Sequence, residues 1–457
     1  MLKRVKEIAD IIQKSRNIHI VTHIDADGIA AGAIATETLQ RMGKEHSIEC
    51  IKQLDETIIN KLVNENHELV WFTDLGSSIS TAYPEINKII TDHHACPQDS
   101  DVPFHLNPHL FGRDGSFDIS GAGVTYLVSK SLNNKNMDLS ALAIVGACGD
   151  LQDRRYCRLN GFNCEILKDG IRAGVLQKRM DIRYFGRETR PLSKLLQYSS
   201  DPFIPGLTGR EDACTLFLQE LEIRLKDEDY WRKWIDLTNE ERQKIISSIA
   251  QMLLTKGFGH KIVSRIIGEI YILSKEKQGT ELHDAKEFAT LLNSTARYDQ
   301  HEVGLNVCLG DRGKWLKKAL NLLRGHRQNL AEGLQFAREE QIQKREFVQF
   351  FHAGEGIRET IIGIVTNMML NSEEVNSDLP LIGFAYTENG EVKVSARTTQ
   401  ALVDKGLNLS NALRRAATEL DGVGGGHNIA AGATIPKGKE EEFLELVEKE
   451  IKNQLGL

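Results

Sequence analysis

The first half of the chain alternates apolar segments typical of β-strands with segments typical of α-helices. The apolar stretch at 17–28, "NIHIVTHIDADG", ends in polar residues and is followed by a helix of small residues at 28–43. Further strands are predicted at 68–78 and 86–94, and a further helix at 121–132. Ser120 is the expected cap of that last helix. Because strands that alternate with helices form parallel sheets, the pattern predicts an α/β fold.

Ionisable residues gather where these strands end, which is where ligands bind in parallel sheets. They are His23, Asp25 and Asp27 in "HIDADG", Asp74 in "DLGS", Asp92, His93 and His94 in "DHH", and Asp150 with Asp153 in "GDLQD". The last motif ends a segment, 139–153, that reads as a buried helix or strand. Taken singly, an Asp after a strand is more often a cap or a turn residue. Taken together, so many carboxylates on one rim repel one another unless cations lie among them.

The ligand types indicate which cations these are. Oxygen-rich ligands with one or two imidazoles and no thiolate suit Mn²⁺ or Mg²⁺ better than a structural zinc ion. This many carboxylates can hold two ions about 3.5 to 4 Å apart, one beside an attacking water and one beside the leaving oxygen of a phosphoester. The rim therefore predicts phosphoester hydrolysis with two Mn²⁺ ions, or with Mg²⁺ in their place.

Length and composition describe a globular chain with room for two or three domains. Of its 457 residues, 41% are apolar, which is enough for a large core. No apolar run is long enough to cross a bilayer, and the amphipathic start "MLKRVKEIADII" is not a signal peptide, so we predict a cytoplasmic protein without a membrane partner. The seven Cys form no CxxC pair, which argues against a disulfide framework. A net charge of −7 argues against non-specific coating of nucleic acid but allows a local basic groove.

The pattern of predicted helices and strands changes twice along the chain, so we predict three domains, at residues 1–200, 201–345 and 346–457. The middle region opens with "DPFIPGLTG" and continues as charged, mostly helical sequence that ends in a connecting helix. The last region returns to α/β patterning, with a hairpin whose predicted type I′ turn is at Asn389 and Gly390. The glycine run in "GVGGGHNIA" is expected to present backbone N–H groups to a phosphate at a helix start.

"HIDADG", "DLGS", "DHH" and "GDLQD", in this order and spacing, resemble the four motifs of the DHH phosphoesterase superfamily over about the first 160 residues. "GGGH", preceded by "SARTT", resembles the DHH-associated domain that grips the substrate in that superfamily. The layout is most similar to archaeal RecJ-like nucleases, including those that associate with the GINS replication complex. The resemblance implies a parallel-sheet DHH domain, an inserted mostly helical region and a smaller C-terminal α/β DHH-associated domain.

The resemblance also implies a role for each site residue. Asp74 bridges two Mn²⁺ ions. Asp25 and His23 complete the ligand set of one ion, and Asp27, His93 and Asp150 complete that of the other. His23 stands closer to the first aspartate than in many relatives, which leaves its role as a ligand open. His94 faces the scissile phosphate, and Asp92 orients its neighbours. Substrate phosphates are expected to contact Arg397, Gly424, Gly425, Gly426 and His427 in the last domain.

Three functions are consistent with these features. The first is an exonuclease acting on single-stranded DNA or RNA in replication or repair, with a GINS-type protein partner. The second is a phosphoesterase for short oligonucleotides, dinucleotides or pyrophosphate, and the third is a non-catalytic replication scaffold. The complete carboxylate set argues against the scaffold. Segment 171–190 carries six basic residues with Tyr184 and Phe185 among them, which favours either a single-strand track or a solvated hairpin.

Overall fold

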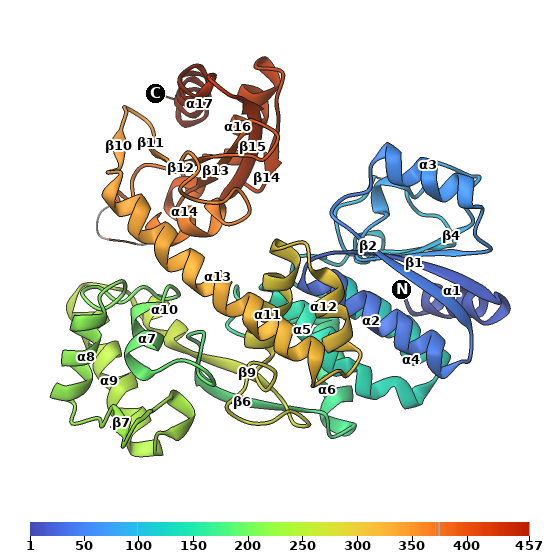
Figure 1. Ribbon diagram of the computed structural model, residues 1–457, viewed down its shortest axis with the longest axis horizontal. Coiled ribbons are helices and arrows are strands. Elements are labelled where there is room, and N and C mark those ends of the chain that lie inside the picture. The colour runs from blue at the N-terminus through green and yellow to red at the C-terminus, as the bar shows by residue number, and fades with distance from the viewer. Residues whose placement is uncertain (98, 371, 373–374, 457) are drawn as a thin grey trace. The chain divides into compact units, whose positions relative to one another are not determined.

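The computed structural model describes residues 1–97, 99–370, 372 and 375–456. It divides into two compact units, Met1–Leu323 and Arg324–Leu457, and helix α13 (Lys314–Glu339) contains the boundary between them (Figure 1). Among the described residues, no helix is both long enough and apolar enough to span a membrane.

The first unit is built on a parallel sheet of five strands in the order β2-β1-β3-β4-β5. The strands are β1 (Asn17–His23), β2 (Glu45–Ile51), β3 (Val70–Thr73), β4 (Lys88–Thr91) and β5 (His105–Leu106). The first helices of this unit are α1 (Leu2–Lys14), α2 (Ala26–Arg41), α3 (Glu56–Glu65), α4 (Gly121–Leu132), α5 (Ser140–Gly149) and α6 (Gly161–Arg172). The predicted α/β fold with a parallel sheet is confirmed.

Helices cover both faces of this sheet. Successive residues of a strand point to opposite faces. Val21 and Phe72 therefore join Ile59 of α3 in one apolar cluster, whereas Ile20 and Trp71 belong to the larger core of α1, α2, α4 and α5. Asp25 caps α2 by accepting the N–H of Gly28, and Ser120 caps α4 as predicted. The parallel sheet and these helix caps together place the loops that follow β1, β3 and β4 at one edge of the sheet.

The middle of the chain forms a lobe with its own core. The antiparallel pair β6 (Leu176–Ile182) and β9 (Ile267–Leu273) enters and leaves it. Between them lie α7 (Leu192–Gln197), α8 (Glu211–Glu220), the hairpin β7 (Lys226–Asp227) and β8 (Tyr230–Trp231), α9 (Asn239–Thr255) and α10 (His260–Val263). The lobe also contains the short 3₁₀ helices η4 (Trp234–Asp236) and η5 (Ser264–Ile266). Three more 3₁₀ helices precede it in the chain: η1 (Ser77–Ile79), η2 (Pro108–Phe111) and η3 (Asn134–Leu139). Trp234, Leu218 and Ile249 are fully buried in this lobe.

The chain then returns to the core of the first unit. Helices α11 (Ala285–Arg297) and α12 (His301–Cys308) pack on α2 and α5, and Phe288, Leu292 and Val303 are buried there. The sheet domain is therefore completed by residues from the far side of the middle lobe.

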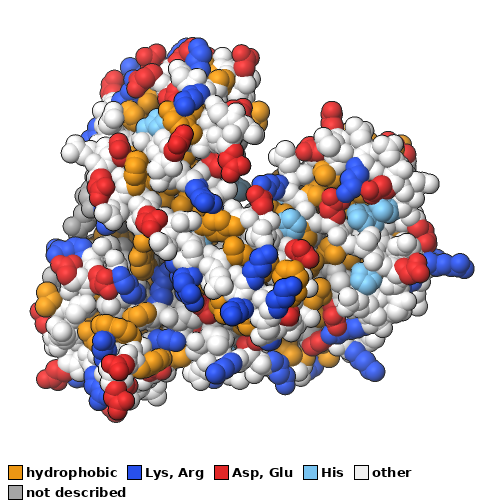
Figure 2. Space-filling view, in the orientation of Figure 1, with side chains coloured by type: hydrophobic (Ala, Val, Ile, Leu, Met, Phe, Trp, Pro, Cys, Tyr) orange, Lys and Arg blue, Asp and Glu red, His pale blue; other side chains and the backbone are white. Residues whose placement is uncertain are grey.

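The second half of segment 171–190 is largely buried. Tyr184 is buried and donates its hydroxyl hydrogen to the carbonyl of Pro202. Arg187 is buried between Asp181 and Asp284, and the guanidinium of Arg190 lies over the Phe185 ring. Arg183 and Arg187 are therefore held by carboxylates within the fold, whereas Arg172, Lys178 and Arg179 in the first half of the segment are exposed. Figure 2 likewise shows basic and acidic side chains interspersed over the visible face.

The second unit has a mixed sheet of six strands in the order β10-β11-β12-β13-β15-β14. The strands are β10 (Gln343–Lys344), β11 (Gln349–His352), β12 (Leu381–Tyr386), β13 (Glu391–Arg397), β14 (Val423–Gly426) and β15 (Ala430–Pro436). The helices are α14 (Ile362–Leu370), α15 (Gln400–Asp404), α16 (Leu409–Glu419) and α17 (Glu440–Leu455). Phe384 and Leu413 join Phe443 in the core beneath α16 and α17. The predicted smaller α/β domain is confirmed.

Two local predictions in this unit are wrong. In the β12–β13 hairpin only Gly390 has a positive φ, and its N–H donates to the carbonyl of Thr387, so a type I turn followed by a left-handed glycine replaces the predicted type I′ turn. The glycine run does not begin a helix. It forms edge strand β14, which pairs with β15, and the main chain reverses after it through a bond from His427 N–H to the Ala430 carbonyl.

Candidate metal centre

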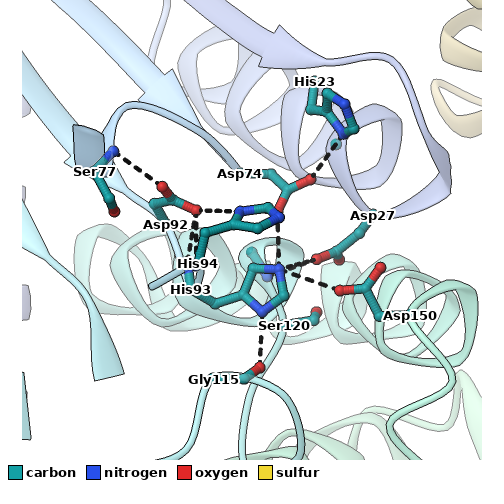
Figure 3. Close-up of polar contacts among 12 residues, drawn as sticks. His23, Asp27, Asp74, Ser77, Asp92, His93, His94, Gly115, Ser120 and Asp150 are labelled. Carbon is teal, nitrogen blue, oxygen red and sulfur yellow. Dashed lines mark hydrogen bonds and ion pairs between the residues drawn. The ribbon is translucent and has the colours of Figure 1, made fainter. Parts of the chain in front are cut away.

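Eight of the predicted site residues lie together at the carboxyl edge of the sheet (Figure 3). His23 ends β1, Asp74 follows β3, and Asp92 begins the loop after β4. These strands are neighbours in the sheet, and parallel strands end at one edge. The full set is His23, Asp25, Asp27, Asp74, Asp92, His93, His94 and Asp150.

Most of the ligand atoms fall into two groups of three that meet at Asp74, and a third group, of Asp74, His93 and His94, overlaps both. In the first, Nδ1 of His23 lies 3.0 Å from Asp25 Oδ2 and 3.7 Å from Asp74 Oδ2. In the second, Asp27, His93 and Asp150 converge, with His93 Nε2 lying 3.1 Å from Asp150 Oδ2 and 3.7 Å from Asp27 Oδ2. His93 Nε2 is also 3.3 Å from Asp74 Oδ1. One carboxylate therefore contacts both groups through different oxygens.

Asp74 is held in a conformation that few residues adopt. Its φ is +59°, in the left-handed region, where Asp and Asn are tolerated better than most other residues. Its N–H donates to the carbonyl of Thr91 at 2.9 Å, which fixes the backbone between β3 and β4. The carboxylate is buried, and neither of its oxygens has a hydrogen-bond partner. Backbone strain and an unsatisfied buried carboxylate at one residue are typical of a functional site.

His93 is oriented by a bond from its far side. Its Nδ1 lies 2.7 Å from the Gly115 carbonyl, which can only accept, so Nδ1 carries a hydrogen and Nε2 faces the three carboxylates. A carbonyl behind a histidine ring is the usual support of a metal-binding imidazole.

Asp27 belongs to the first turn of α2, and its carboxylate lies at the start of α4, where it accepts the N–H groups of Gly121 at 2.6 Å and Ala122 at 3.0 Å. The N-terminus of a helix favours negative charge. Side chains are excluded at two points: a Cβ on Gly121 would lie 2.2 Å from Asp74 Oδ1, and one on Gly146 would lie 2.1 Å from Asp27 Oδ1. The glycines let α4 and α5 approach the carboxylates.

Asp92 organises the loop rather than pointing at the two groups. Its Oδ1 accepts from the N–H of His93 and from the N–H and Nδ1 of His94, and its Oδ2 accepts from the N–H of Ser77. Burial disfavours its charge, yet the bonds from His94 hold the pKa of Asp92 well below its usual range. His94 thus has Nδ1 fixed, while its side chain is 56% exposed.

Protonation shows how crowded the negative charge is. Burial, reinforced by Asp74 and Asp150, raises the pKa of Asp27 well above its usual range. Burial also raises the pKa of Asp150. Although burial opposes it, contact with Asp25 and Asp74 raises the pKa of His23 to about 11. These three shifts add positive charge or remove negative charge, which is what a cation at this place would do. Asp25 shifts the other way: although burial opposes it, contact with His23 lowers the pKa of Asp25.

The donor set fits divalent cations that prefer oxygen ligands. Four carboxylates and up to three imidazoles face a small volume, and no cysteine joins these groups in the described chain. His93 Nε2 and His23 Nδ1 are buried without hydrogen-bond partners, as are both oxygens of Asp74. Cations between the groups would satisfy these atoms and remove the repulsion.

Asp153 does not belong to the site, although it shares the "GDLQD" motif with Asp150. Leu151 has a φ of +56° and reverses the chain, so Asp153 is buried beside Lys286 Nζ at 2.5 Å. The sequence pattern did not predict that α11 lies beside the metal centre: Asn293 Oδ1 accepts the N–H of Ala26 at 3.0 Å, and Arg297 is close enough to Asp25 to interact with its charge. These residues lie more than 260 positions from "HIDADG", and no local pattern marks them.

The predicted substrate-binding residues come together in the second unit. Arg397 ends β13 opposite Ala430, and Gly424, Gly425 and Gly426 pair with β15. The Arg397 guanidinium donates to Ser395 Oγ at 3.0 Å and to the Ala396 carbonyl at 2.8 Å, and no carboxylate pairs with it among the described residues. Burial lowers the pKa of Arg397. His427 is exposed in the following turn.

Three domain families match different parts of the chain. Residues 17–147 match the DHH family, N-terminal domain, residues 184–267 match the DHH-CID domain, and residues 345–453 match the DHHA1 domain. The uncharacterized protein MJ0831 of Methanocaldococcus jannaschii is 30% identical over 472 residues, and the match covers 100% of both chains. The chain belongs to the DHH family.

Solved structures share the fold of this DHH protein at low identity. RecJ from Thermus thermophilus in complex with Mn²⁺ has a TM-score of 0.60 at 18% identity; the match covers 99% of this chain but only 55% of that RecJ. An exonuclease RecJ bound to manganese also has a TM-score of 0.60, at 17% identity, covering 99% of this chain and 95% of that one. CDC45 from Entamoeba histolytica has a TM-score of 0.69 at 12% identity, covering 99% of each chain.

Proposed function

We propose that this DHH protein is a metal-dependent phosphodiesterase that shortens single-stranded DNA or RNA from an end, in replication or repair. The observation that carries the proposal is the Asp74 carboxylate, which lies between two groups of ligands with both oxygens unsatisfied. A carboxylate in this position suits a pair of Mn²⁺ or Mg²⁺ ions.

Each side chain has a role that its contacts support. His23, Asp25 and Asp74 would hold one ion, and Asp27, His93, Asp150 and Asp74 the other. When bound, such ions activate water and neutralise charge on a phosphodiester. The protein itself orients the ligands: Gly115 fixes His93, and Asp92 fixes His94 so that the exposed edge of its ring is free for a substrate phosphate.

We propose that catalysis belongs to residues 1–200 and that 346–457 grips the substrate, with Arg397 as the main phosphate contact. Its guanidinium donates only to neutral oxygens in the described part of the second unit, so an anionic ligand would give it its missing partner. Gly424, Gly425, Gly426 and His427 would complete this grip. Within the middle region, 201–345, α11 and α12 complete the core of the first unit. The lobe between β6 and β9 would extend the substrate path or bind a protein partner of the GINS type.

Two other functions compete with this proposal. Hydrolysis of short oligonucleotides or dinucleotides needs the same metal centre, and strand length alone separates it from exonuclease activity. A non-catalytic scaffold has no need for buried, mutually repelling carboxylates. The proposal therefore ranks hydrolysis of long strands first, short substrates second and the scaffold third.

Digestion of end-labelled single strands separates these functions. DNA and RNA strands blocked at either end, and a labelled dinucleotide, are incubated with Mn²⁺, with Mg²⁺ or with a chelator. We expect stepwise shortening of long strands that requires metal and one free end, and no shortening by Asp74→Asn. Cleavage of the dinucleotide alone would favour the second function. No metal-dependent cleavage of any substrate would refute both enzymatic functions.

A further inference from the structure

Two large apolar side chains are exposed on the rim of the metal centre. Leu151 directly follows the ligand Asp150 and is 53% exposed, and Tyr156 is 47% exposed in the same loop. Single large apolar side chains are common on protein surfaces. Two of them together beside a polar centre, one carrying an aromatic ring, indicate a binding surface.

Tyr156 is part of a stack with Phe117 and Arg155, which we call the rim platform. The Arg155 guanidinium lies over the Phe117 ring, 4.8 Å from its centroid, and over the Tyr156 ring, 5.2 Å from its centroid. The two rings meet edge to face at 6.4 Å and 71°. Three planar groups therefore hold one another in fixed orientations while Tyr156 and Arg155 remain exposed.

The loops that carry the rim platform are tied to the metal centre. The Gly115 carbonyl accepts from His93 Nδ1 at 2.7 Å and from Gln152 Nε2 at 2.8 Å, so one atom joins both loops to a ligand. Phe117 is two residues beyond Gly115, which limits its backbone to about 7 Å from that carbonyl. A group that stacks on the rim platform thus lies within reach of the metal centre.

The charge of the rim platform is also available to a ligand. Arg155 is exposed and forms no ion pair with the described residues, and Arg158 in the same loop is exposed as well. Planar aromatic faces combined with unpaired guanidinium groups suit a nucleotide, which has both a flat base and an anionic phosphate.

We propose that the rim platform is a nucleobase subsite that stacks one base of the substrate strand beside the scissile phosphate. This inference rests on the proposed phosphodiesterase function and narrows its substrate. The enzyme would select nucleotide chains over phosphoesters that lack a base, and stacking would tolerate all four bases because each has a π-face.

Binding of matched strands tests the rim platform. A fluorescent single strand and the same strand with abasic sugars at its terminal nucleotides are titrated by anisotropy, with the protein loaded with Ca²⁺. We expect the abasic strand to bind wild type about tenfold more weakly. Tyr156→Ala should weaken binding of the normal strand to the same degree and leave the abasic strand unchanged, whereas Tyr156→Phe, which keeps the ring, should bind as wild type does. Tyr230→Ala is the control, since Tyr230 is also 47% exposed but lies on β8.

The outcomes separate this inference from the proposed function. Equal affinity of wild type for both strands, or an equal loss of affinity for both strands in Tyr156→Ala, overturns the rim platform. Either result leaves the proposed hydrolysis untouched. If Tyr156→Ala loses affinity for the normal strand alone while wild type cleaves no strand with Mn²⁺, the rim platform is supported and the phosphodiesterase function is refuted. Failure of wild type to bind either strand would overturn both.

Discussion

Two clusters of buried charge lie in the first unit, and they are built in opposite ways. In the metal centre, carboxylates face one another and neither oxygen of Asp74 has a hydrogen-bond partner. In the second, which we call the closed cluster, each carboxylate meets a donor: Asp284 lies 2.6 Å and Asp181 lies 3.2 Å from the guanidinium of Arg187, and Glu287 accepts from Thr189 Oγ1 and the N–H of Glu188. The closed cluster joins the middle lobe to α11.

The difference indicates what each cluster is for. Buried charges that are paired within the protein stabilise one arrangement of the chain, and removing one partner is costly. Buried charges that repel one another destabilise the fold until an external cation binds. Substitutions in the metal centre should therefore abolish activity without loss of stability, and substitutions in the closed cluster should do the reverse.

The largest effect is expected at Asp74. Asp74→Asn keeps a side chain that tolerates the left-handed backbone but removes the charge shared by the two ligand groups. Mn²⁺-dependent kcat/KM should fall by at least about 10³-fold, while the metal-free protein unfolds at the same or a higher denaturant concentration because repulsion is relieved. Asp10→Asn, on the exposed face of α1, is the control. Retained turnover would exclude Asp74 as a shared ligand.

The next effect is on stability. Arg187 is only 5% exposed, so Arg187→Met leaves the carboxylates of Asp181 and Asp284 buried without their cation. Urea unfolding should show a loss of about 3 to 5 kcal/mol. Arg179→Met removes an exposed arginine from β6 and should cost little. Equal losses in both variants would mean that the closed cluster is not a source of stability.

A third effect depends on pH. Burial and the neighbouring Asp284 raise the pKa of Glu287 from 4.5 to about 7. The unfolded chain therefore loses this proton at a lower pH than the folded protein does. Because of this, the contribution of Glu287 to the free energy of unfolding falls as the pH rises from 4.5 to 7 and is constant above pH 7. The fall should be up to about 3 kcal/mol and should vanish in Glu287→Gln. Unfolding free energies at several pH values, with the exposed Glu165→Gln as control, measure it; parallel curves for wild type and Glu287→Gln would contradict the expectation.

The smallest effect is expected at Asp92, which orients ligands without joining either group. Asp92→Asn should weaken Mn²⁺ binding by roughly 10- to 100-fold in a calorimetric titration, because His93 and His94 lose their common anchor. Asp55→Asn is a matched control, since Asp55 also accepts a backbone N–H but at the start of α3. An unchanged affinity would show that the loop after β4 holds its own shape.

The sequence predicted those parts of the site that depend on neighbours in the chain. Each strand ends in its own acidic or imidazole residues, and adjacency of parallel strands brings them together, so His23, Asp74 and His93 needed only the strand pattern. Asp153 was placed wrongly because its position depends on the reversal at Leu151 and on a lysine 133 residues further on. The type I′ turn failed because Asn389 and Gly390 fit two turn types, and the strands decide between them.

The return of α11 and α12 to the sheet core has a consequence for how the protein is made. The groove that they fill on α2 and α5 begins to be synthesised about 260 residues before they are. At roughly 5 to 20 residues per second, that interval is about 13 to 50 seconds. During it, Ile29 and its neighbours on the nascent chain have no native cover, so the first motif of the metal centre to leave the ribosome is among the last to gain its final surroundings.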